Sequence, residues 1–193
     1  LGHDASEYEL PPLHVHQHTV EIEHNDAHGL FAMEAQTLSD RRDARRASLV
    51  ERVRECARIV NADDQPWVVW CDLNAEGDAL TAAIDGAVQI SGADDPDVKE
   101  RRLHDFSAGR IRVLVSKPSI CGFGLNWQHA SRMAFVGVTD SFESYYQAVR
   151  REWRFGQTKP VHVHVFASNL EGAVVANLKR KERDALAMAE AMA

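Results

Sequence analysis

Short runs of consecutive apolar residues alternate along the chain with longer stretches in which apolar residues recur every three or four positions. An uninterrupted apolar run predicts a strand buried on both faces, and recurrence at three and four positions predicts a helix with one apolar face. The predicted strands are 67–71, 88–90, 112–116, 133–138 and 161–166, with one more at 15–23 where polar and apolar residues alternate. The predicted helices are 38–60, 74–84, 95–106, 141–155 and 171–193.

The order of these elements predicts an α/β domain of three layers with a mainly parallel central sheet. Strands that are apolar throughout and are separated by helices are typical of a parallel sheet covered on both faces. Right-handed crossovers then give an open, doubly wound sheet. Because ligands of such sheets bind beyond the carboxyl ends of the strands, we expect the site near the loops after residues 71, 116 and 138.

The beginning of the chain differs from the rest, because it is irregular and rich in histidine. His14, His16 and His18 would lie on one face of the strand predicted there. Three imidazoles in this arrangement suit either a transition-metal site or an exposed strand face. We therefore expect residues 1–37 to form a linker with a first strand, and residues 38–193 to form the domain proper.

The composition is that of one soluble globular domain. The chain has 193 residues, of which 45% are hydrophobic and 26% charged, and a chain of this length buries about 70% of its unfolded surface without a disulfide or metal staple. Its three widely spaced cysteines predict reduced thiols rather than a disulfide framework or a zinc ribbon. No secretory signal and no apolar run of about 18 residues is present, so we expect no membrane partner and a cytoplasmic location.

The formal net charge of −7 argues against tight binding of nucleic acid by the chain alone. Local clusters can nevertheless dominate a contact. Basic residues gather at 41–58, 99–112, 150–159 and 179–183. The arginines of the first cluster are expected either on a solvated helix face or in contact with nucleic acid or another lobe.

The predicted helix 141–155 has two distinct faces. One is an apolar stripe, and the other carries Gln147, Arg151 and Arg154, which are spaced by four and three positions. Like charges at this spacing repel by a few tenths of a kcal/mol. The spacing by itself fits either a polyanion opposite the arginines or a solvated basic face.

The loop after strand 112–116 is the second candidate for chemistry. It contains Gly122 and Gly124 one residue apart, which permits positive φ angles and close approach of the backbone to a ligand. An ordinary tight turn has the same composition. Its place at the carboxyl end of a strand favours the ligand-binding interpretation. Cys71 and Cys121 are expected to be buried structural thiols rather than nucleophiles.

Two segments together resemble the C-terminal RecA-like lobe of superfamily 2 helicases, most closely the Swi/Snf-like branch and its phage and prophage relatives. Residues 147–157, Gln-Ala-Val-Arg-Arg-Glu-Trp-Arg-Phe-Gly-Gln, are similar to motif VI of that family. Residues 119–126, Ser-Ile-Cys-Gly-Phe-Gly-Leu-Asn, are similar to motif V, and 67–73 occupies the place of motif IV. The resemblance implies a RecA-like fold in an ATP-dependent DNA helicase or translocase of the cytoplasm of a bacterial or phage-infected cell, with RNA as an alternative substrate.

The resemblance also implies roles for the residues of motif VI. Arg151 and Arg154 would be catalytic and would reach the phosphates of ATP, with Arg154 as the arginine finger. A guanidinium suits this role because it stays charged and binds phosphate oxygens through two parallel hydrogen bonds. Gln147 would order the two arginines or contact the nucleotide.

In motif V, the resemblance implies contacts to both ligands of the motor. Gly124 and Asn126 would lie toward the ATP. Ser119, Gly122 and Lys117 would contact the backbone of the nucleic acid.

The parts that would hold ATP and Mg²⁺ are missing from the sequence. No Gly-Lys dipeptide occurs, so there is no P-loop, and no Asp-Glu pair follows an apolar strand. We therefore expect ATP and Mg²⁺ to be bound mainly by an N-terminal RecA-like lobe, as part of the same protein or in trans. The chain alone is expected to be inactive and to need no metal or cofactor of its own.

Two functions of other classes remain open from the residues. One is a non-catalytic module of RecA-like fold that binds nucleic acid or a protein through its basic helix faces. The other is a metal-dependent hydrolase built on the histidine strand.

Overall fold

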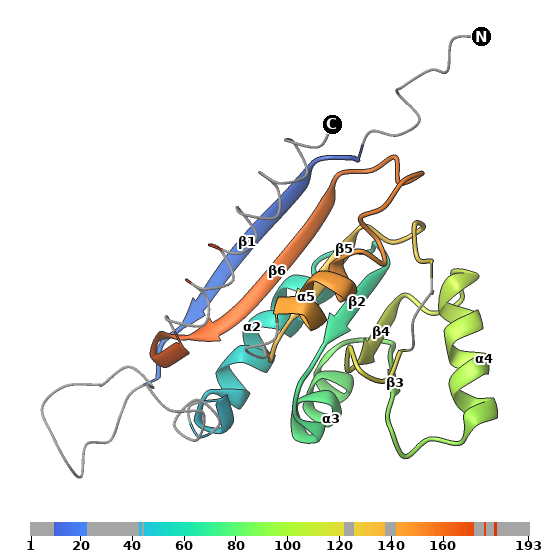
Figure 1. Cartoon of the computed structure of the whole chain (residues 1–193). Helices are drawn as coiled ribbons and strands as arrows, with labels where there is room; N and C mark the ends of the chain where they lie inside the picture. Colours follow the sequence, from blue (N-terminus) through green and yellow to red (C-terminus); the bar gives the residue numbers. More distant parts are fainter. Residues whose placement is uncertain are drawn as a thin grey trace, which may run out of the picture.

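The computed structural model of the protein describes residues 10–22, 43, 45–121, 126–137, 142–171, 176 and 180. Six described strands form one sheet in the order β1-β6-β5-β2-β4-β3 (Figure 1). Each neighbouring pair runs parallel. This confirms the predicted α/β domain with a parallel central sheet.

All the predicted strands are present. Those predicted from apolar runs lie in the core, where both faces of the sheet are covered. The strands are β1 Leu13–Val20, β2 Trp67–Trp70, β3 Ala87–Ile90, β4 Val113–Ser116, β5 Arg132–Phe135 and β6 Val161–Ser168. The helices are α2 Leu49–Asn61, α3 Asn74–Ala83, α4 Pro96–Ser107 and α5 Phe142–Val149, and β6 leads into the 3₁₀ turn η2 Asn169–Glu171. The helix expected over 171–193 lies almost entirely outside the described residues. None of the described helices is long and apolar enough to cross a membrane.

The sheet has an apolar core on each face, and β2 contributes to both. Trp67 and Val69 belong to the core that packs under α2 and α3, whereas Val68 and Trp70 belong to the core under α4 and α5. In Figure 1, α5 accordingly crosses the sheet on the face opposite to α2. The three-layer arrangement therefore follows from the alternation of side chains along β2.

Helix α5 ends six residues earlier than the predicted 155. After Val149 the backbone bonding is mixed: tighter i to i−3 bonds run from Arg151 N to Ala148 O (3.3 Å) and from Glu152 N to Val149 O (3.2 Å), and one i to i−4 bond runs from Trp153 N to Val149 O (3.0 Å). Gly156, with φ of +88°, closes the turn in a conformation that favours glycine. The 3.6-residue phase is therefore lost after Val149, and the helix face expected to present Gln147, Arg151 and Arg154 together does not continue.

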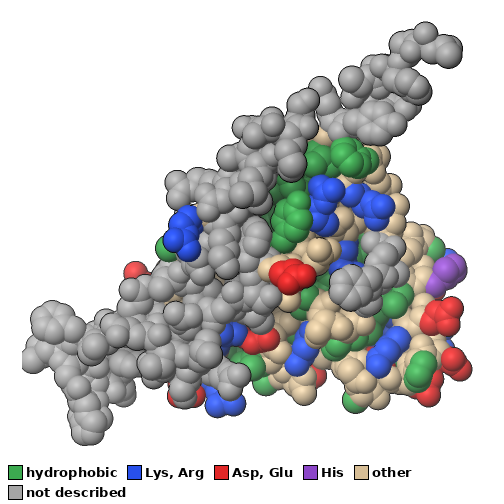
Figure 2. Space-filling view, viewed as in Figure 1, with side chains coloured by type: hydrophobic (Ala, Val, Ile, Leu, Met, Phe, Trp, Pro, Cys, Tyr) green, Lys and Arg blue, Asp and Glu red, His purple; other side chains and the backbone are tan. Residues whose placement is uncertain are grey.

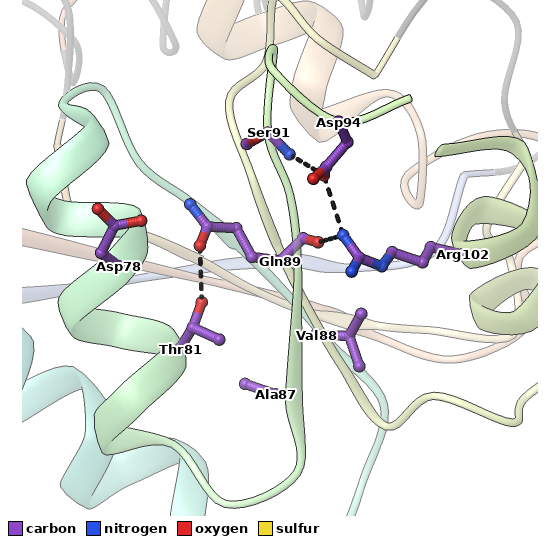
Figure 3. Close-up of a pocket in the computed structure, with 8 residues that line it drawn as sticks. All are labelled: Asp78, Thr81, Ala87, Val88, Gln89, Ser91, Asp94 and Arg102. Atoms are coloured by element: carbon purple, nitrogen blue, oxygen red, sulfur yellow. Dashed lines mark hydrogen bonds and ion pairs between the residues drawn. The ribbon is translucent and has the colours of Figure 1, made fainter. Parts of the chain in front are cut away.

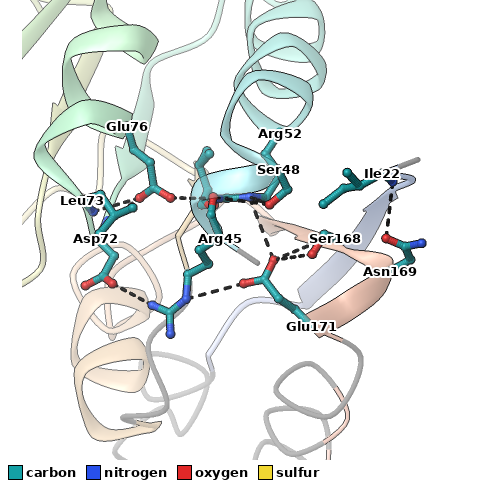
Figure 4. Close-up of polar contacts among 11 residues, drawn as sticks. Ile22, Arg45, Ser48, Arg52, Asp72, Leu73, Glu76, Ser168, Asn169 and Glu171 are labelled. Atoms are coloured by element: carbon teal, nitrogen blue, oxygen red, sulfur yellow. Dashed lines mark hydrogen bonds and ion pairs between the residues drawn. The ribbon is translucent and has the colours of Figure 1, made fainter. Parts of the chain in front are cut away.

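A cluster of buried charges joins α2 to the carboxyl ends of three strands (Figure 4). Arg52 is fully buried and pairs with Glu76 of α3 at 2.8 Å. It also donates to Ser48 Oγ and to the carbonyl of Val136, just after β5. Arg45 pairs with Asp72 at 2.7 Å and lies 3.6 Å from Glu171.

The expectation that the arginines of 41–58 occupy a solvated or ligand-binding face is therefore wrong for Arg45 and Arg52. Their exposed fractions are 5% and 0%. Their acidic partners come from α3, from the loop after β2 and from η2, which are distant along the chain. Arg46, Arg54 and Arg58 are exposed, as expected for the outer side of a surface helix.

Strands β1 and β6 bring their histidines together in one ladder. His16 Nε2 lies 2.9 Å from His162 Nδ1, and His18 Nε2 lies 3.0 Å from His164 Nδ1. Successive rings are stacked, with centroids 4.5 Å apart for His16 and His164. The histidine face of β1 is thus paired with β6 rather than left open, and in the part of the chain that the structure describes no group of histidine, cysteine and acidic residues could hold a metal ion.

Candidate functional site

The two segments singled out in the sequence meet on the face of the sheet covered by α4 and α5. The chain leaves β4, passes the described turn 117–120, and returns at Asn126 to the segment 126–130 that leads into β5. After β5 it forms α5 and then the segment 150–157. The backbone N–H of Trp127, the residue directly after the segment 119–126, donates to the carbonyl of Arg151 in the segment 147–157 at 3.1 Å.

Two glutamine side chains strengthen this junction between the segments 126–130 and 150–157. Gln157 is only 5% exposed, and its Nε2 lies 2.9 Å from the carbonyl of Ala130 and 3.1 Å from that of Gln128. Gln128 Nε2 in turn donates to the carbonyl of Phe155. Because several bonds link the same two segments, a displacement of one will be transmitted to the other.

Arg151 occupies an aromatic cage rather than an open surface. Its Cζ lies 5.5 Å from the centre of the Trp70 ring and 5.7 Å from that of Trp127, within the range of a cation–π contact. The residue is 9% exposed, and burial lowers the pKa of its guanidinium. A desolvated contact of this kind contributes about 2 kcal/mol. The expected position of Arg151, beside Arg154 on a solvent-facing surface, is therefore wrong, because α5 ends before it.

Arg154 is placed differently from Arg151. It is partly exposed, and its guanidinium forms no hydrogen bond or ion pair with another residue of the described ranges. Gln147 is exposed on α5, and the Cζ of Arg150 lies 5.5 Å from the ring of Trp153. Of the two arginines predicted to reach a nucleotide, Arg154 is partly exposed to solvent, whereas Arg151 is buried.

The residues predicted in the loop after β4 are only partly described. Lys117 is partly exposed and Ser119 exposed, in a turn closed by a bond from Ile120 N to Lys117 O of 3.0 Å. Asn126 is exposed and exchanges two side-chain bonds of 3.3 Å with Gln128. Gly122 and Gly124 lie outside the described residues.

The described positive side chains do not form one continuous patch on the face that Figure 2 shows. Figure 2 shows Lys and Arg spread over this face of the molecule among apolar and uncharged polar groups. With a net charge of −7, the chain has no general attraction for a polyanion. Any contact with nucleic acid must therefore be local.

A pocket of about 430 Å³ lies away from the two segments, along the edge strand β3 (Figure 3). Arg102 of α4 reaches across it and donates to the carbonyl of Gln89 at 2.7 Å while pairing with Asp94 at 2.9 Å. Charged side chains of this kind protect the open edge of a sheet from pairing with another chain. None of the predicted site residues lines this pocket.

The cysteines are structural, as expected. All three are buried and free. Burial raises the pKa of Cys56, of Cys121 and of Cys71, the last to about 12. Burial of this kind disfavours the thiolate, which is the nucleophilic form of cysteine.

The parts of the site that depend on aromatic and amide side chains have no clear signal in the sequence. Trp70 and Trp127 cage Arg151, and Gln157 joins three carbonyls, yet neither role has a sequence signal beyond the positions of these residues. A tryptophan directly after the loop pattern, together with an arginine in the other segment, is the only local hint of the cage.

Residues 56–156 match the protein family described as helicase conserved C-terminal domain. Two curated relatives are similar to part of the chain. The bifunctional helicase and thymine dioxygenase JBP2 of Leishmania braziliensis is 30% identical over 97 residues, and the human ATP-dependent DNA helicase Q4 is 40% identical over 70 residues. These matches cover 50% and 35% of the chain but only 9% and 6% of the relatives, so the chain spans a small fraction of either protein.

Solved structures with the same fold include part of an ATPase domain and an RNA helicase. The C-terminal part of the Fun30 ATPase domain superposes with a TM-score of 0.58 and 14% identity, over 68% of the chain and 45% of that structure. The ADP-bound RNA helicase Prp28 from Chaetomium thermophilum gives a TM-score of 0.58 and 19% identity, over 70% of the chain and 34% of that structure. These superpositions confirm the RecA-like fold.

Proposed function

The chain belongs to the helicase conserved C-terminal domain family, and from that premise we propose that it is the C-terminal motor lobe of an ATP-dependent DNA helicase or translocase. It would work with an N-terminal RecA-like lobe that carries the P-loop, in the same protein or in trans. The observation that carries the proposal is Arg154, a partly exposed guanidinium without a side-chain partner in the described structure, placed three residues after a buried arginine.

Arg154 is proposed to be the arginine finger. A guanidinium directed at the transferring phosphoryl group stabilises its charge and contributes about 10³–10⁵-fold in rate in other nucleoside triphosphatases. The segment that carries Arg154 is held by the Gln157 and Trp127 bonds, so the finger would be delivered on a rigid support. Gln147, exposed on α5 and four residues before Arg151, would contact the nucleotide or order the approach to it.

The described residues fit the phosphates of ATP but not its metal ion. Arg154 offers donors for phosphate oxygens, whereas no group of three acidic, histidine or cysteine residues in the described ranges could hold Mg²⁺. Mg²⁺ would therefore be bound by the partner lobe, and this chain alone would not hydrolyse ATP.

DNA is the proposed nucleic acid, with contacts from the turn after β4. Lys117 and Ser119 lie there directly after the strand, at least partly exposed. The choice of DNA rests on the 40% identity to a protein described as a DNA helicase. Replacing a lysine that contacts a phosphate lowers the salt dependence of binding by about one ion, so Lys117→Ala tests this contact.

The deciding measurement is nucleic-acid-stimulated ATP hydrolysis by the full-length protein. Arg154→Ala should lower turnover by roughly 10³-fold or more, while binding of a fluorescent ATP analogue stays unchanged. Arg101→Ala, an exposed arginine on α4, is the matched control and should leave turnover unchanged. If the full-length protein binds DNA without hydrolysing ATP, it is instead a non-catalytic binding module. If Arg154→Ala retains full turnover, the finger is another residue.

A further inference from the structure

We propose that the segment 10–12, directly before β1, positions the arginine finger through one hydrogen bond, from Trp153 Nε1 to the carbonyl of Pro11. In this role Trp153 is a positioning residue, which acts through its neighbour Arg154 and contacts neither ATP nor DNA. The role rests on the proposed function, because it concerns the support of the proposed finger.

The acceptor of this bond belongs to a stiff piece of backbone. Pro11 and Pro12 are consecutive, so their rings fix both φ angles, and Pro12 also restricts the conformation of Pro11. The carbonyl of Pro11 accepts from Trp153 Nε1 at 2.8 Å, and that of Pro12 accepts from Val161 N at 2.9 Å. Since Val161 is the first residue of β6, which begins beside the start of β1 (Figure 1), the segment 10–12 is bonded to the sheet where it holds the indole.

The indole of Trp153 depends on this bond. Trp153 is 7% exposed and belongs to the core under α4 and α5, against which Leu10 and Leu13 also pack. Its Nε1–H is the only polar group of the ring, so a shift of the segment 10–12 would leave a buried donor without its partner, which is unfavourable. The Cζ of Arg150 lies 5.5 Å from the centre of the ring, within the range of a cation–π contact. The indole is therefore fixed in position rather than free to turn.

A fixed indole determines where the next side chain points. Trp153 is buried, whereas Arg154 is partly exposed, so the chain leaves the core between these two residues. The chain is held again after Arg154, because Gln157 N donates to the Arg154 carbonyl at 3.1 Å. The backbone of Arg154 is thus held on both sides, and a shift of Trp153 would move the guanidinium away from its place.

One arm of the test uses the 193-residue chain and needs no activity. The indole N–H resonance of Trp153 is the one that disappears from the NMR spectrum of Trp153→Phe. Its exchange with water should become faster by about tenfold or more in Pro11→Gly/Pro12→Gly, which keeps the carbonyl but frees the backbone around it. The indole N–H of Trp127, which donates to Ser107, should be unaffected. Equal exchange at Trp153 in the two proteins would overturn the anchoring by the segment 10–12.

The other arm measures DNA-stimulated ATP hydrolysis by the full-length protein. Trp153→Phe should lower kcat by about 10- to 100-fold, because a small misplacement of a catalytic group has a cost of this size. KM for ATP should stay within about twofold of the wild-type value, since the finger acts in the transition state. Replacement of Trp153 by 3-benzothienylalanine, in which sulfur takes the place of the N–H group, should lower kcat in the same way and so assign the effect to the hydrogen bond.

Two controls separate positioning from a general loss of stability. Trp67→Phe alters a tryptophan that is 1% exposed and packs under α2 and α3 on the other face of the sheet. It should lower the thermal midpoint about as much as Trp153→Phe does but leave kcat within about twofold of wild type. In an Arg154→Ala background, Trp153→Phe should cause no further loss, because no finger is left to misplace.

Full turnover in Trp153→Phe, or an equal loss in the presence and absence of Arg154, would overturn the positioning role. A rise in KM for ATP with unchanged kcat would make Trp153 a nucleotide contact and overturn it as well. If Arg154→Ala retains full turnover, or if the wild-type full-length protein hydrolyses no ATP, the proposed function fails and the positioning role fails with it. The exchange measurement still decides in that case whether the bond between Trp153 and Pro11 exists.

Discussion

Arg52 of α2 and Glu76 of α3 form an ion pair of 2.8 Å in which neither side chain is exposed to solvent. Glu76 also accepts the backbone N–H groups of Asp72 and Leu73, at 2.9 and 3.0 Å, where the chain leaves β2 and enters α3. Arg52 donates to the carbonyl of Val136 where the chain leaves β5. A single buried pair thus ties two helices to the ends of two adjacent strands.

Breaking this pair from one side is expected to be costly. Glu76→Gln would leave the buried Arg52 charge with only the longer contact to Glu171, at 4.0 Å, and removal of one partner of a buried pair costs about 3–5 kcal/mol. The double variant Arg52→Met/Glu76→Met should recover part of the loss, because it removes both charges of the pair together. Urea unfolding followed by circular dichroism measures the free energy of unfolding of the single and the double variant.

The control for the Arg52 pair is the surface pair of Arg58 and Glu55, which also joins an arginine and a glutamate at 2.7 Å on α2. Arg58→Met should leave the unfolding midpoint unchanged, because exposed pairs contribute little. Equal effects of Glu76→Gln and Arg58→Met would contradict the importance assigned to the buried pair.

Gly137 provides a second test of the same region. A Cβ at this position would lie 2.9 Å from Asp72 Cβ and 3.0 Å from Asp72 N, and would also meet the Glu76 carboxylate. Gly137→Ala should therefore lower the free energy of unfolding by about 1–3 kcal/mol through overpacking. Gly92→Ala is the matched control, since nothing lies within 4 Å of a Cβ there, and it should have no such effect. Thermal unfolding of the two variants gives the comparison.

The sequence predicts the positions of the strands well and the positions of the charged side chains poorly. Strands β2, β4 and β6 are found within about two residues of their predicted ends, because an apolar run is a local property that burial on both faces requires. The end of α5 is not predicted, because periodicity does not reveal where the α-helical bonds give way to tighter turns. The predicted orientation of Arg151, on one helix face with Arg154, is wrong for this reason.

The charged groups were misplaced for a different physical reason. Arg52 has the same local neighbourhood as the exposed Arg54 and Arg58, and only its distant partners Glu76 and Glu171 make its burial favourable. Ion pairs between elements carry no signal in a single sequence. The histidine ladder was half predicted, since the histidine face of β1 was identified but its pairing with the histidines of β6 was not.

The histidine ladder predicts acid-sensitive stability. Burial, followed by the nearby His16, His18, His162 and Arg132, lowers the pKa of His164 from 6.5 to about 3. The unfolded chain therefore binds more protons between those two values, so stability falls as the pH falls below about 6.5. The pKa values of His16, His18 and His162 are lowered in the same direction, mainly by burial.

The urea midpoint should accordingly decrease from pH 7 to pH 5, and His164→Asn should weaken this dependence. The charged groups facing the ladder are Arg132 and Asp63 beside β5, and Glu55 and Arg58 on α2. The pKa values of Asp63 and Glu55 are lowered from values already below 5, so these acids stay ionised in this range. An unchanged pH dependence in His164→Asn would exclude His164 as its source.

Glu152 predicts a pH dependence of stability opposite to that of the histidine ladder. The carboxyl group is fully buried, and neither oxygen has a hydrogen-bond partner in the described structure. Burial raises the pKa of Glu152 well above its ordinary value, an effect that Arg132 only partly offsets. Because the unfolded chain loses this proton at a lower pH than the folded chain, stability should fall as the pH rises above about 4.5.

Glu152→Gln should therefore stabilise the protein at pH 8, because a neutral group of the same shape has no charge to desolvate. The gain reflects the difference between the folded and unfolded pKa of this carboxyl group, at about 1.4 kcal/mol in the free energy of unfolding for each pKa unit. The gain should shrink toward pH 5, where the wild-type carboxyl group is already protonated in the folded chain. Glu143→Gln, at an exposed position on α5, serves as the control and should show no pH-dependent gain. Urea unfolding at pH 5 and pH 8 decides the matter: a Glu152→Gln variant that is less stable than the wild type at pH 8 would mean that the carboxylate is ionised and held by a partner.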